Sequence, residues 1–377
     1  MQKGSIGLDE CLASMLRGEE CDAGSSTTSD AELLLSAARE HDIVALVADR
    51  LAAGDQLADT LRRVFREASQ KLAASDLAAE IELRRLLNEL DADGVQVLVI
   101  KGSHLAYSHY SRPDLRARID SDLLVGRTQR DSATRVLGGL GYVPDAKPSG
   151  ELTATQQLHA LTRHGADVHL VDLHWRLASP QVFAHVLRFD ELLAASQPIP
   201  SLGPRARGPS NVHALLIACM HQVAHHNDEP HKLKWTYDIH LIASRLEARE
   251  WDGFLTIIAE RGVAAVCREG LSQAARWLHT HVPAWVLSDA RLVSHAPERT
   301  AEYLRPRAQA RVVLDDLRVL TTWSERSQLM REHLFPSRDY MRSVYAPSSR
   351  MPLAAMYVLR ALRGARRWLW RSAADTH

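Results

Sequence analysis

Apolar positions recur with helical spacing over residues 57–91. Four leucines fall at i, i+3, i+4 and i+7 and form one apolar face: Leu83, Leu86, Leu87 and Leu90. Gly94 follows as a helix C-cap, because glycine adopts the left-handed conformation that ends many helices. The pattern predicts one long helix that ends just before the next apolar segment.

Three shorter segments have the character of strands. Val95–Ile100 is β-branched and lies between Gly94 and Gly102, which is typical of a buried strand. Residues 123–125 (Leu-Leu-Val) are a second apolar run, and polar and apolar residues alternate over 166–175. In this last segment Asp172 shares a face with Leu170 and His174, while the opposite face suits a core. Residues 156–162 fit neither pattern clearly.

Helical patterns cover most of the remaining chain, over residues 29–39, 43–51, 128–140, 211–224, 251–261, 263–279, 311–334 and 352–371. We therefore expect an α+β fold, a small mixed β-sheet core with a helical N-terminal region and a helical C-terminal domain. The predicted units are a flexible N-terminus at 1–28, a helical region at 29–92, the core at 93–196, a helical domain at 205–350 and a basic C-terminal helix at 351–377. A stretch rich in Pro, Gly, Ser and Arg, residues 197–211, links the core to the helical domain.

Composition and charge narrow the class of protein. The 377 residues are 46% hydrophobic and 24% charged, which is ordinary for a globular protein. Lys and Arg number 46 and so do Asp and Glu, so net charge gives no case for nucleic-acid binding. The four cysteines lack C-x-x-C spacing, and we expect reduced thiols. No signal peptide and no apolar run of about 20 residues is visible, so we expect a cytoplasmic protein.

Three aspartates are the candidate metal ligands. Asp120 and Asp122 stand two apart at the start of an apolar run, so on a strand both carboxylates leave the same face. Asp172 is a carboxylate on an otherwise buried strand and needs a partner there. A shared Mg²⁺ or Mn²⁺ would supply one, since such cations take carboxylate and phosphate oxygens together. Gly102 and Ser103 follow the first strand and begin a helix, where backbone N–H groups favour an anion such as a triphosphate.

The order of these motifs resembles a known family. Residues 100–105 (Ile-Lys-Gly-Ser-His-Leu), 115–125 (Leu-Arg through Asp-Ser-Asp-Leu-Leu-Val) and 171–175 (Val-Asp-Leu-His-Trp) are similar to a bacterial branch usually called uncharacterised nucleotidyltransferases. The broader likeness is to the DNA polymerase β-type superfamily, with its h-G-[GS] and [DE]-h-[DE]-h signature. Ser121 departs from that signature, which has an apolar residue between the two acids. The resemblance covers about residues 30 to 350.

The resemblance implies a function and roles for the site residues. It implies metal-dependent transfer of an NMP group from an NTP, such as ATP, to an acceptor hydroxyl, with pyrophosphate leaving. The metal ligands and catalytic acids would be Asp120, Asp122 and Asp172. Lys101, Gly102, Ser103 and Arg116 would meet the nucleotide, and a solvated charge or salt bridge is the alternative for Lys101 and Arg116. His174 would donate a hydrogen bond to a metal ligand or act as a base, and a structural histidine with satisfied hydrogen bonds is the alternative.

A histidine-rich block follows the linker. His221 and His225 are i, i+4 on one predicted helical face, with His226 beside them, but the metalloprotease motif H-E-x-x-H is absent. The family has a similar block followed by an L-K/R-W-x-x-D-I helix, here residues 233–239. By that resemblance Lys234, Asp238 and the histidines, His221 and His225 among them, would also face the nucleotide or acceptor. Structural polar contacts and an independent zinc site are the alternatives.

The acceptor and other partners stay open. The acceptor could be a small molecule, a sugar or a protein side chain, and the neutral charge makes nucleic acid a weaker choice. The C-terminal segment carries five arginines and no acid over 352–371, which suits membrane contact, although a solvated surface helix is the favoured interpretation. The competing functions are a non-catalytic nucleotide-binding or scaffold protein with the same fold, and a hydrolase that binds a metal through its histidines.

Overall fold

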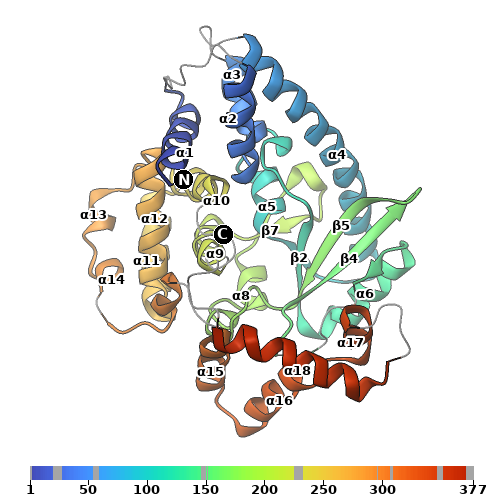
Figure 1. The fold of residues 1–377 in the computed structure, drawn as a ribbon. Coiled ribbons are helices and arrows are strands. Elements are labelled where there is room, and N and C mark those ends of the chain that lie inside the picture. Colours follow the sequence, from blue (N-terminus) through green and yellow to red (C-terminus); the bar gives the residue numbers. More distant parts are fainter. Residues whose placement is uncertain are drawn as a thin grey trace.

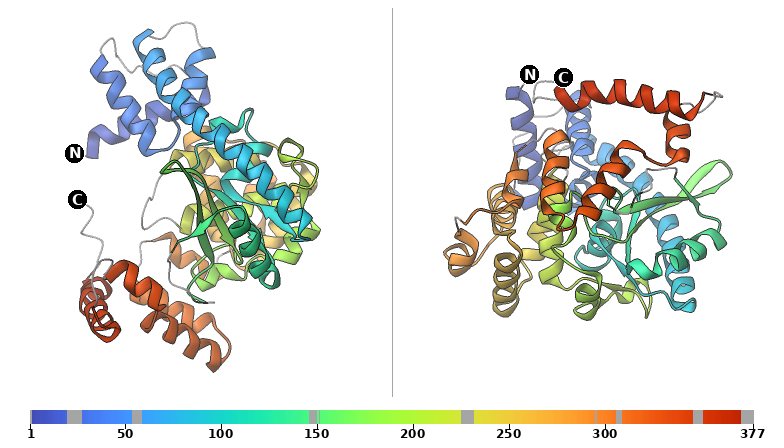
Figure 2. Two further views of the ribbon diagram at one scale, coloured as in Figure 1. Left: turned by 90° about the vertical axis from the view of Figure 1, so that its right-hand side faces the viewer. Right: turned by 90° about the horizontal axis from the view of Figure 1, so that it is seen from below.

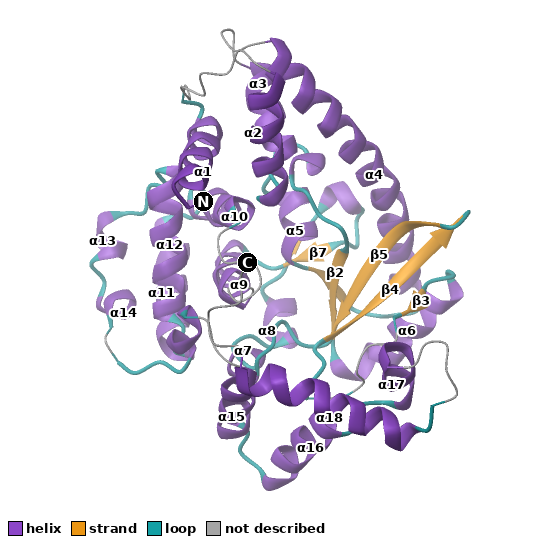
Figure 3. Ribbon diagram, viewed as in Figure 1, coloured by secondary structure: helices purple, strands orange, loops and turns teal. Residues whose placement is uncertain are grey.

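A five-stranded mixed sheet surrounded by helices forms the centre of the computed structural model (Figure 1, Figure 3). The structure describes residues 2–19, 28–53, 59–145, 150, 152–224, 232–294, 296–305, 309–345 and 351–370. The predicted α+β class is confirmed, with helices on the N-terminal and C-terminal sides of the core.

The sheet has the strand order β1-β2-β5-β4-β3. The strands are β1 Val97–Val99, β2 Ser121–Val125, β3 Val143–Pro144, β4 Gln156–Arg163 and β5 Ala166–His174. The β2–β5 pair is parallel, whereas β1–β2, β4–β5 and β3–β4 are antiparallel. The ambiguous segment at 156–162 is thus a full strand, because β5 supplies its hydrogen-bonding partner over most of its length.

The long predicted helix, α4 (Asp59–Ala92), covers one face of the sheet together with α6 (Arg130–Gly139). Figure 2 shows α4 lying alongside the strands. The four leucines of its apolar face are buried against Val99, Leu123 and Val171. A buried leucine of this kind stabilises a fold by about 1.5–3 kcal/mol relative to an exposed one, so this face is held mainly by apolar burial.

Several helices pack on the other face, which carries Leu98, Ile100 and Leu124. They are α5 (Lys101–Ser108), α9 (Asn211–Ala224), α10 (Leu233–Ala243), α11 (Ala248–Arg261) and α12 (Ala264–Leu278). The short helices α13 (Ala284–Leu287) and α14 (Ala290–Val293) follow. One continuous apolar cluster joins this face to the N-terminal helices α1 (Gln2–Arg17), α2 (Thr28–Glu40) and α3 (Val44–Ala53).

The N-terminus differs from the expectation of a flexible stretch over 1–28. Helix α1 is well formed, and Leu12 and Leu16 are 0% and 2% exposed within the main apolar cluster. Apolar burial against α3 and α12 therefore orders this segment. The expectation of four reduced thiols is wrong at Cys11, which forms a disulfide bond, whereas Cys219 and Cys267 are free and buried.

The linker at 197–211 contains a small two-stranded ribbon, β6 (Gln197–Pro198) with β7 (Arg207–Gly208). It follows the short helices α7 (Gln181–Ala184) and α8 (Phe189–Ala194). A Cβ at Gly208 would lie 2.3 Å from the buried ring of His104 in α5, so glycine is required for this close approach. The linker is thereby packed on the core.

The last helices lie together at one side of the molecule, as Figure 2 shows. Their buried apolar residues form two small clusters, one of which includes Leu152 of the core. These helices are α15 (Gln309–Val319), α16 (Trp323–Leu334), α17 (Arg338–Tyr345) and α18 (Leu353–Trp370). The single helix predicted at 311–334 is divided, because Thr322 and Glu325 form a capping box that starts α16. The side chains of 363–370 lie outside the described residues, so membrane contact through the C-terminal arginines stays a prediction. Within the described chain, no helix combines the length and apolar character that a membrane crossing needs.

Candidate metal and nucleotide site

Two of the predicted acids face each other across the parallel strand pair. Asp122 of β2 is the direct register partner of Asp172 of β5, and both side chains are buried. His174 follows two residues after Asp172 and so leaves the same face of β5. Its Nε2 lies 2.8 Å from Asp122 Oδ1. The alternation of the strands therefore brings two carboxylates and one imidazole together.

These three side chains have the chemistry of a divalent-cation site. One potential ligand atom from each of Asp122, Asp172 and His174 lies within 4.8 Å of the other two. Asp172 Oδ2 accepts a hydrogen bond from Gln156 Nε2, whereas the buried Asp172 Oδ1 has no hydrogen-bond partner in the described part of the chain. A buried carboxylate oxygen without a partner is costly, and a cation at this point would satisfy it. Two carboxylates and one imidazole are ligands that suit a divalent cation.

Lys101 projects into the same cluster from the turn between β1 and α5. Its Nζ lies 2.8 Å from Asp122 Oδ1 and 3.2 Å from His174 Nε2. The Lys101 backbone has φ = 50°, a left-handed conformation that is uncommon for a residue with a side chain. Burial raises the pKa of Asp122, but the Lys101 ammonium and the His174 ring outweigh it and hold that pKa well below its usual range. Burial and the same ammonium lower the pKa of His174.

Asp120 lies just before β2 and is half-buried. Burial raises the pKa of Asp120 to about 7, and the negative charges of Asp122 and Asp172 contribute to the shift. The electrostatic influence of both acids indicates that the three carboxylates share one environment. The metal role of Asp120 stays a prediction, because the cluster of close ligand atoms comprises Asp122, Asp172 and His174.

Gly102 and Ser103 lie at the strand–helix turn, as predicted from the sequence, but Ser103 does not cap the helix. Helix α5 begins at Lys101 with Ile100 as N-cap and has no side-chain cap hydrogen bond. Ser103 is buried inside the first turn, and its hydroxyl donates to the Asp120 carbonyl oxygen at 3.5 Å. A Cβ at Gly102 would lie 3.5 Å from the Arg116 guanidinium, an ordinary contact. Space thus permits a side chain at residue 102.

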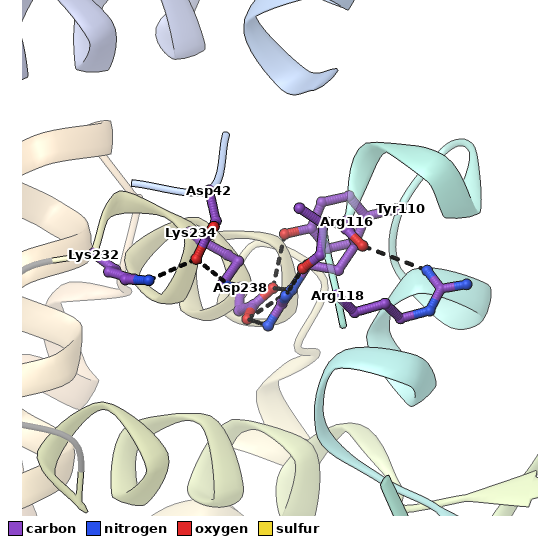
Figure 4. A network of polar contacts seen from close by, with 8 residues as sticks. Asp42, Tyr110, Arg116, Arg118, Lys232, Lys234 and Asp238 are labelled. Atoms are coloured by element: carbon purple, nitrogen blue, oxygen red, sulfur yellow. Dashed lines mark hydrogen bonds and ion pairs between the residues drawn. The ribbon is translucent and has the colours of Figure 1, made fainter. Parts of the chain in front are cut away.

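Arg116 is bound by Asp238 in a buried ion pair (Figure 4). Its Nε and Nη2 donate to the Asp238 carboxylate at 2.8 and 2.7 Å, and both side chains are 5% exposed. The Tyr110 hydroxyl donates to the same carboxylate at 2.7 Å. Two residues predicted to bind nucleotide are thus bound to each other, which links the loop before β2 to α10.

Lys234 is held in a second ion pair of this network (Figure 4). Its Nζ lies 2.8 Å from Asp42 Oδ2, which Lys232 also contacts at 2.7 Å. Burial and the Arg116 charge lower the pKa of Lys234. This lysine thus ties α10 to the turn between α2 and α3, and its predicted contact with nucleotide stays a prediction.

His221 lies in α9 and packs edge-on against Trp235 at a ring distance of 5.3 Å. His225 and His226 lie outside the described residues, so a zinc site there stays a prediction. His221 and Trp235 line a small pocket together with Lys101, Gly102, Leu105 and Arg116. Lys101, which contacts Asp122, thus lines a pocket whose other walls include residues of α9 and α10.

Sequence reasoning missed two polar partners of the site, Gln156 and Tyr110. Gln156 contacts Asp172 because β4 pairs with β5 in a register that puts Gln156 opposite His174. The pattern of residues 156–162 did not identify this strand, and a register between strands is not visible in local sequence. Tyr110 reaches Asp238 across 128 positions of the chain, and no local pattern predicts such a contact.

The acidic cluster of this α+β protein lies beside a glycine-containing strand–helix turn. Acidic clusters suit a divalent cation, and the N-termini of helices suit an anion. The family model described as uncharacterised nucleotidyltransferase matches residues 27–279 of this chain. That match spans more than half of the 377 residues, and the chain belongs to this family. No curated protein sequence matches the chain significantly. The matched region ends with α12, so α15 to α18 lie outside it.

Proposed function

We propose that the protein is a metal-dependent nucleotidyltransferase of the bacterial branch of the DNA polymerase β-type superfamily. It would move an NMP group from an NTP to an acceptor hydroxyl. The single observation that carries this proposal is the convergence of Asp122, Asp172 and His174 next to the Lys101–Gly102 turn. The family match supports the same class of reaction.

In this proposal, Asp120, Asp122 and Asp172 hold Mg²⁺ or Mn²⁺ at the start of β2 and the end of β5. When bound, the cation supplies charge neutralisation for the phosphate oxygens and the entering hydroxyl. Asp172 is oriented by Gln156 and is the acid available to accept the proton of the acceptor hydroxyl. His174 contacts the Asp122 carboxylate through Nε2 and would be a further ligand of the cation.

The nucleotide would lie along the strand–helix turn. Backbone N–H groups of the first turn of α5 point out of the helix end and favour phosphate. Gly102 leaves room there, and Lys101 brings a positive charge. The Arg116–Asp238 pair lines the adjoining pocket, and His221 lines it from α9. Lys234, next to the pocket residue Trp235 on α10, would meet the nucleotide from there.

The test is incubation of the protein with each labelled NTP, Mg²⁺ and a cell extract, followed by mass spectrometry for a product that carries the nucleotide mass. Asp122→Asn is the inactive comparison, and Asp190→Asn is a matched control because Asp190 is 84% exposed and far along the chain in α8. A product with the native protein and Asp190→Asn, and none with Asp122→Asn, supports the proposal.

The competing proposal is a non-catalytic nucleotide-binding or scaffold protein, and the Lys101 contact with Asp122 gives it a specific basis. An ammonium already neutralises part of the acidic cluster, so an anion could bind without metal. Metal-independent nucleotide binding with no labelled product would favour this scaffold function. The acceptor and the cytoplasmic location stay predictions.

A further inference from the structure

The Lys101 ammonium occupies the position where the candidate metal ligands converge. Its Nζ lies 2.8 Å from Asp122 Oδ1 and 3.2 Å from His174 Nε2, and those two atoms lie 2.8 Å apart. The Lys101 side chain is 14% exposed and the Asp122 side chain 12%. One positively charged group is thus in contact with two of the three residues that could coordinate a divalent cation.

An ammonium and a directly bound metal cannot use these atoms together. Metal–ligand distances to carboxylate oxygen and imidazole nitrogen are about 2.0–2.2 Å, shorter than the present separations from Nζ. A cation at that distance from Asp122 Oδ1 and His174 Nε2 would fill the space beside Nζ and repel its charge. Metal entry therefore requires the lysine side chain to leave.

Lys101 has a path out of the cluster. It lines the pocket next to Gly102 and Arg116, and its four-carbon chain can turn without moving the backbone. The left-handed backbone at residue 101 fixes the start of that chain between β1 and α5. On leaving Asp122, the ammonium would face the strand–helix turn, where the phosphates would lie.

We infer that Lys101 is an internal counter-cation which a divalent metal replaces at Asp122 and His174, and that the displaced ammonium then binds a phosphate of the nucleotide. This inference rests on the proposed function in so far as the site takes a divalent metal. If Lys101 is displaced in this way, binding of the metal strengthens binding of the nucleotide, and binding of the nucleotide strengthens binding of the metal. Metal alone must break an existing ion pair, whereas metal with nucleotide gives the ammonium a new anionic partner.

The experiment measures Mn²⁺ binding by isothermal titration calorimetry on the full-length protein, without and with the probe α,β-methylene-ATP. Lys101→Met removes the ammonium and keeps the length of the side chain. The expected result without nucleotide is Mn²⁺ binding at least about tenfold tighter than in the native protein, equal to about 1.4 kcal/mol. The probe should tighten Mn²⁺ binding strongly in the native protein and much less in Lys101→Met.

Lys232→Met is the matched control, because it removes a lysine charge from the same region without a contact to Asp122. Asp42 keeps Lys234 as a partner, so the fold should tolerate the change. The control should alter Mn²⁺ affinity by no more than about threefold, which separates direct competition from the general effect of charge. Lys101→Asn is a second variant, since asparagine adopts the left-handed conformation readily, and it should behave as Lys101→Met.

Both Lys101 variants could be folded by circular dichroism and yet bind Mn²⁺ no more tightly than the native protein. This result would overturn the counter-cation role and leave the proposed transferase function intact. Absence of Mn²⁺ binding by the native protein, even with the probe, would overturn the proposed function itself. Thermal unfolding gives a second reading. Mn²⁺ should raise the melting temperature more in Lys101→Met than in the native protein, because the metal replaces a charge partner that the variant lacks.

Discussion

The buried pair of Arg116 and Asp238 provides the sharpest test of how the site is built. Both side chains are 5% exposed, and Nη2 lies 2.7 Å from Oδ2. At an effective dielectric constant of about 20, two charges at this distance attract by ~6 kcal/mol, before the cost of desolvation is subtracted. Removal of one partner leaves the other charge buried, which typically costs about 3–5 kcal/mol.

Arg116→Met should therefore lower the free energy of unfolding by about 3–5 kcal/mol. Asp238 would retain the Tyr110 hydroxyl but no cation among its direct partners in the described chain. The double variant Arg116→Met with Asp238→Leu should recover much of that loss, because no unpaired charge remains. The assay is urea unfolding monitored by tryptophan fluorescence, arranged as a double-mutant cycle.

Arg135→Met serves as the control, because the Arg135 side chain is 69% exposed and its ion-pair distance to Asp93 is 4.0 Å. It should leave the unfolding free energy unchanged within error. A loss below about 1 kcal/mol for Arg116→Met, no larger than for an exposed pair, would refute the reasoning. Arg116 would then be free in solution, as a direct phosphate ligand would be.

Three further predictions concern the metal cluster, the turn and the C-terminal helices. Asp122→Asn should abolish transfer yet stay folded by circular dichroism, because an amide oxygen still accepts from Lys101; an unfolded variant would make Asp122 a structural residue. Gly102→Val should keep the fold, because the added Cβ has space beside Arg116. It should lose nucleotide binding in calorimetry, because the valine side chain would obstruct the phosphates, and binding equal to that of the native protein would contradict this. Burial raises the pKa of Asp316 to about 6, from 3.8 in the unfolded state. The folded protein is therefore stabilised by the protonated Asp316 below about pH 4, and this contribution to stability is lost as the pH rises through 6. Asp316→Asn should remove this pH dependence, worth up to ~3 kcal/mol, in unfolding measured from pH 4 to 7.

The sequence was sufficient for those elements whose periodicity reports burial directly. The leucine spacing of residues 83–90 predicted α4, and the alternation over 166–175 put Asp172 and His174 on one face of β5. The same reasoning predicted that Asp122 and Asp172 lie close together, and they are register partners in the β2–β5 pair. These features depend on contacts within one element or on a two-residue repeat.

The remaining features depend on partners distant in sequence. Arg116 is separated from Asp238 by 122 positions, so its charge alone could not distinguish a phosphate ligand from a buried pair. The ordering of α1 depends on apolar surfaces of α3 and α12 that its own sequence does not reveal. The Lys101 contact with Asp122 likewise depends on the geometry of the turn. The sequence alone does not show in which direction the side chain of a lysine before a glycine points.

The attachment of the C-terminal helices has a consequence for how such a chain can evolve. They have small apolar clusters that reach the core at Leu152, and two carboxylates add hydrogen bonds to the main chain of the core. Asp316 accepts from the Gln181 backbone N–H at 2.7 Å, and Glu332 accepts from the Leu152 and Thr153 N–H groups at 2.9 and 3.0 Å. Such contacts use main-chain donors, which almost any residue provides. The terminal helices can therefore be exchanged or lengthened between relatives while the sheet and its acids stay unchanged. Because Glu332 holds the segment just before β4, each exchange would also adjust the strand that brings Gln156 to Asp172.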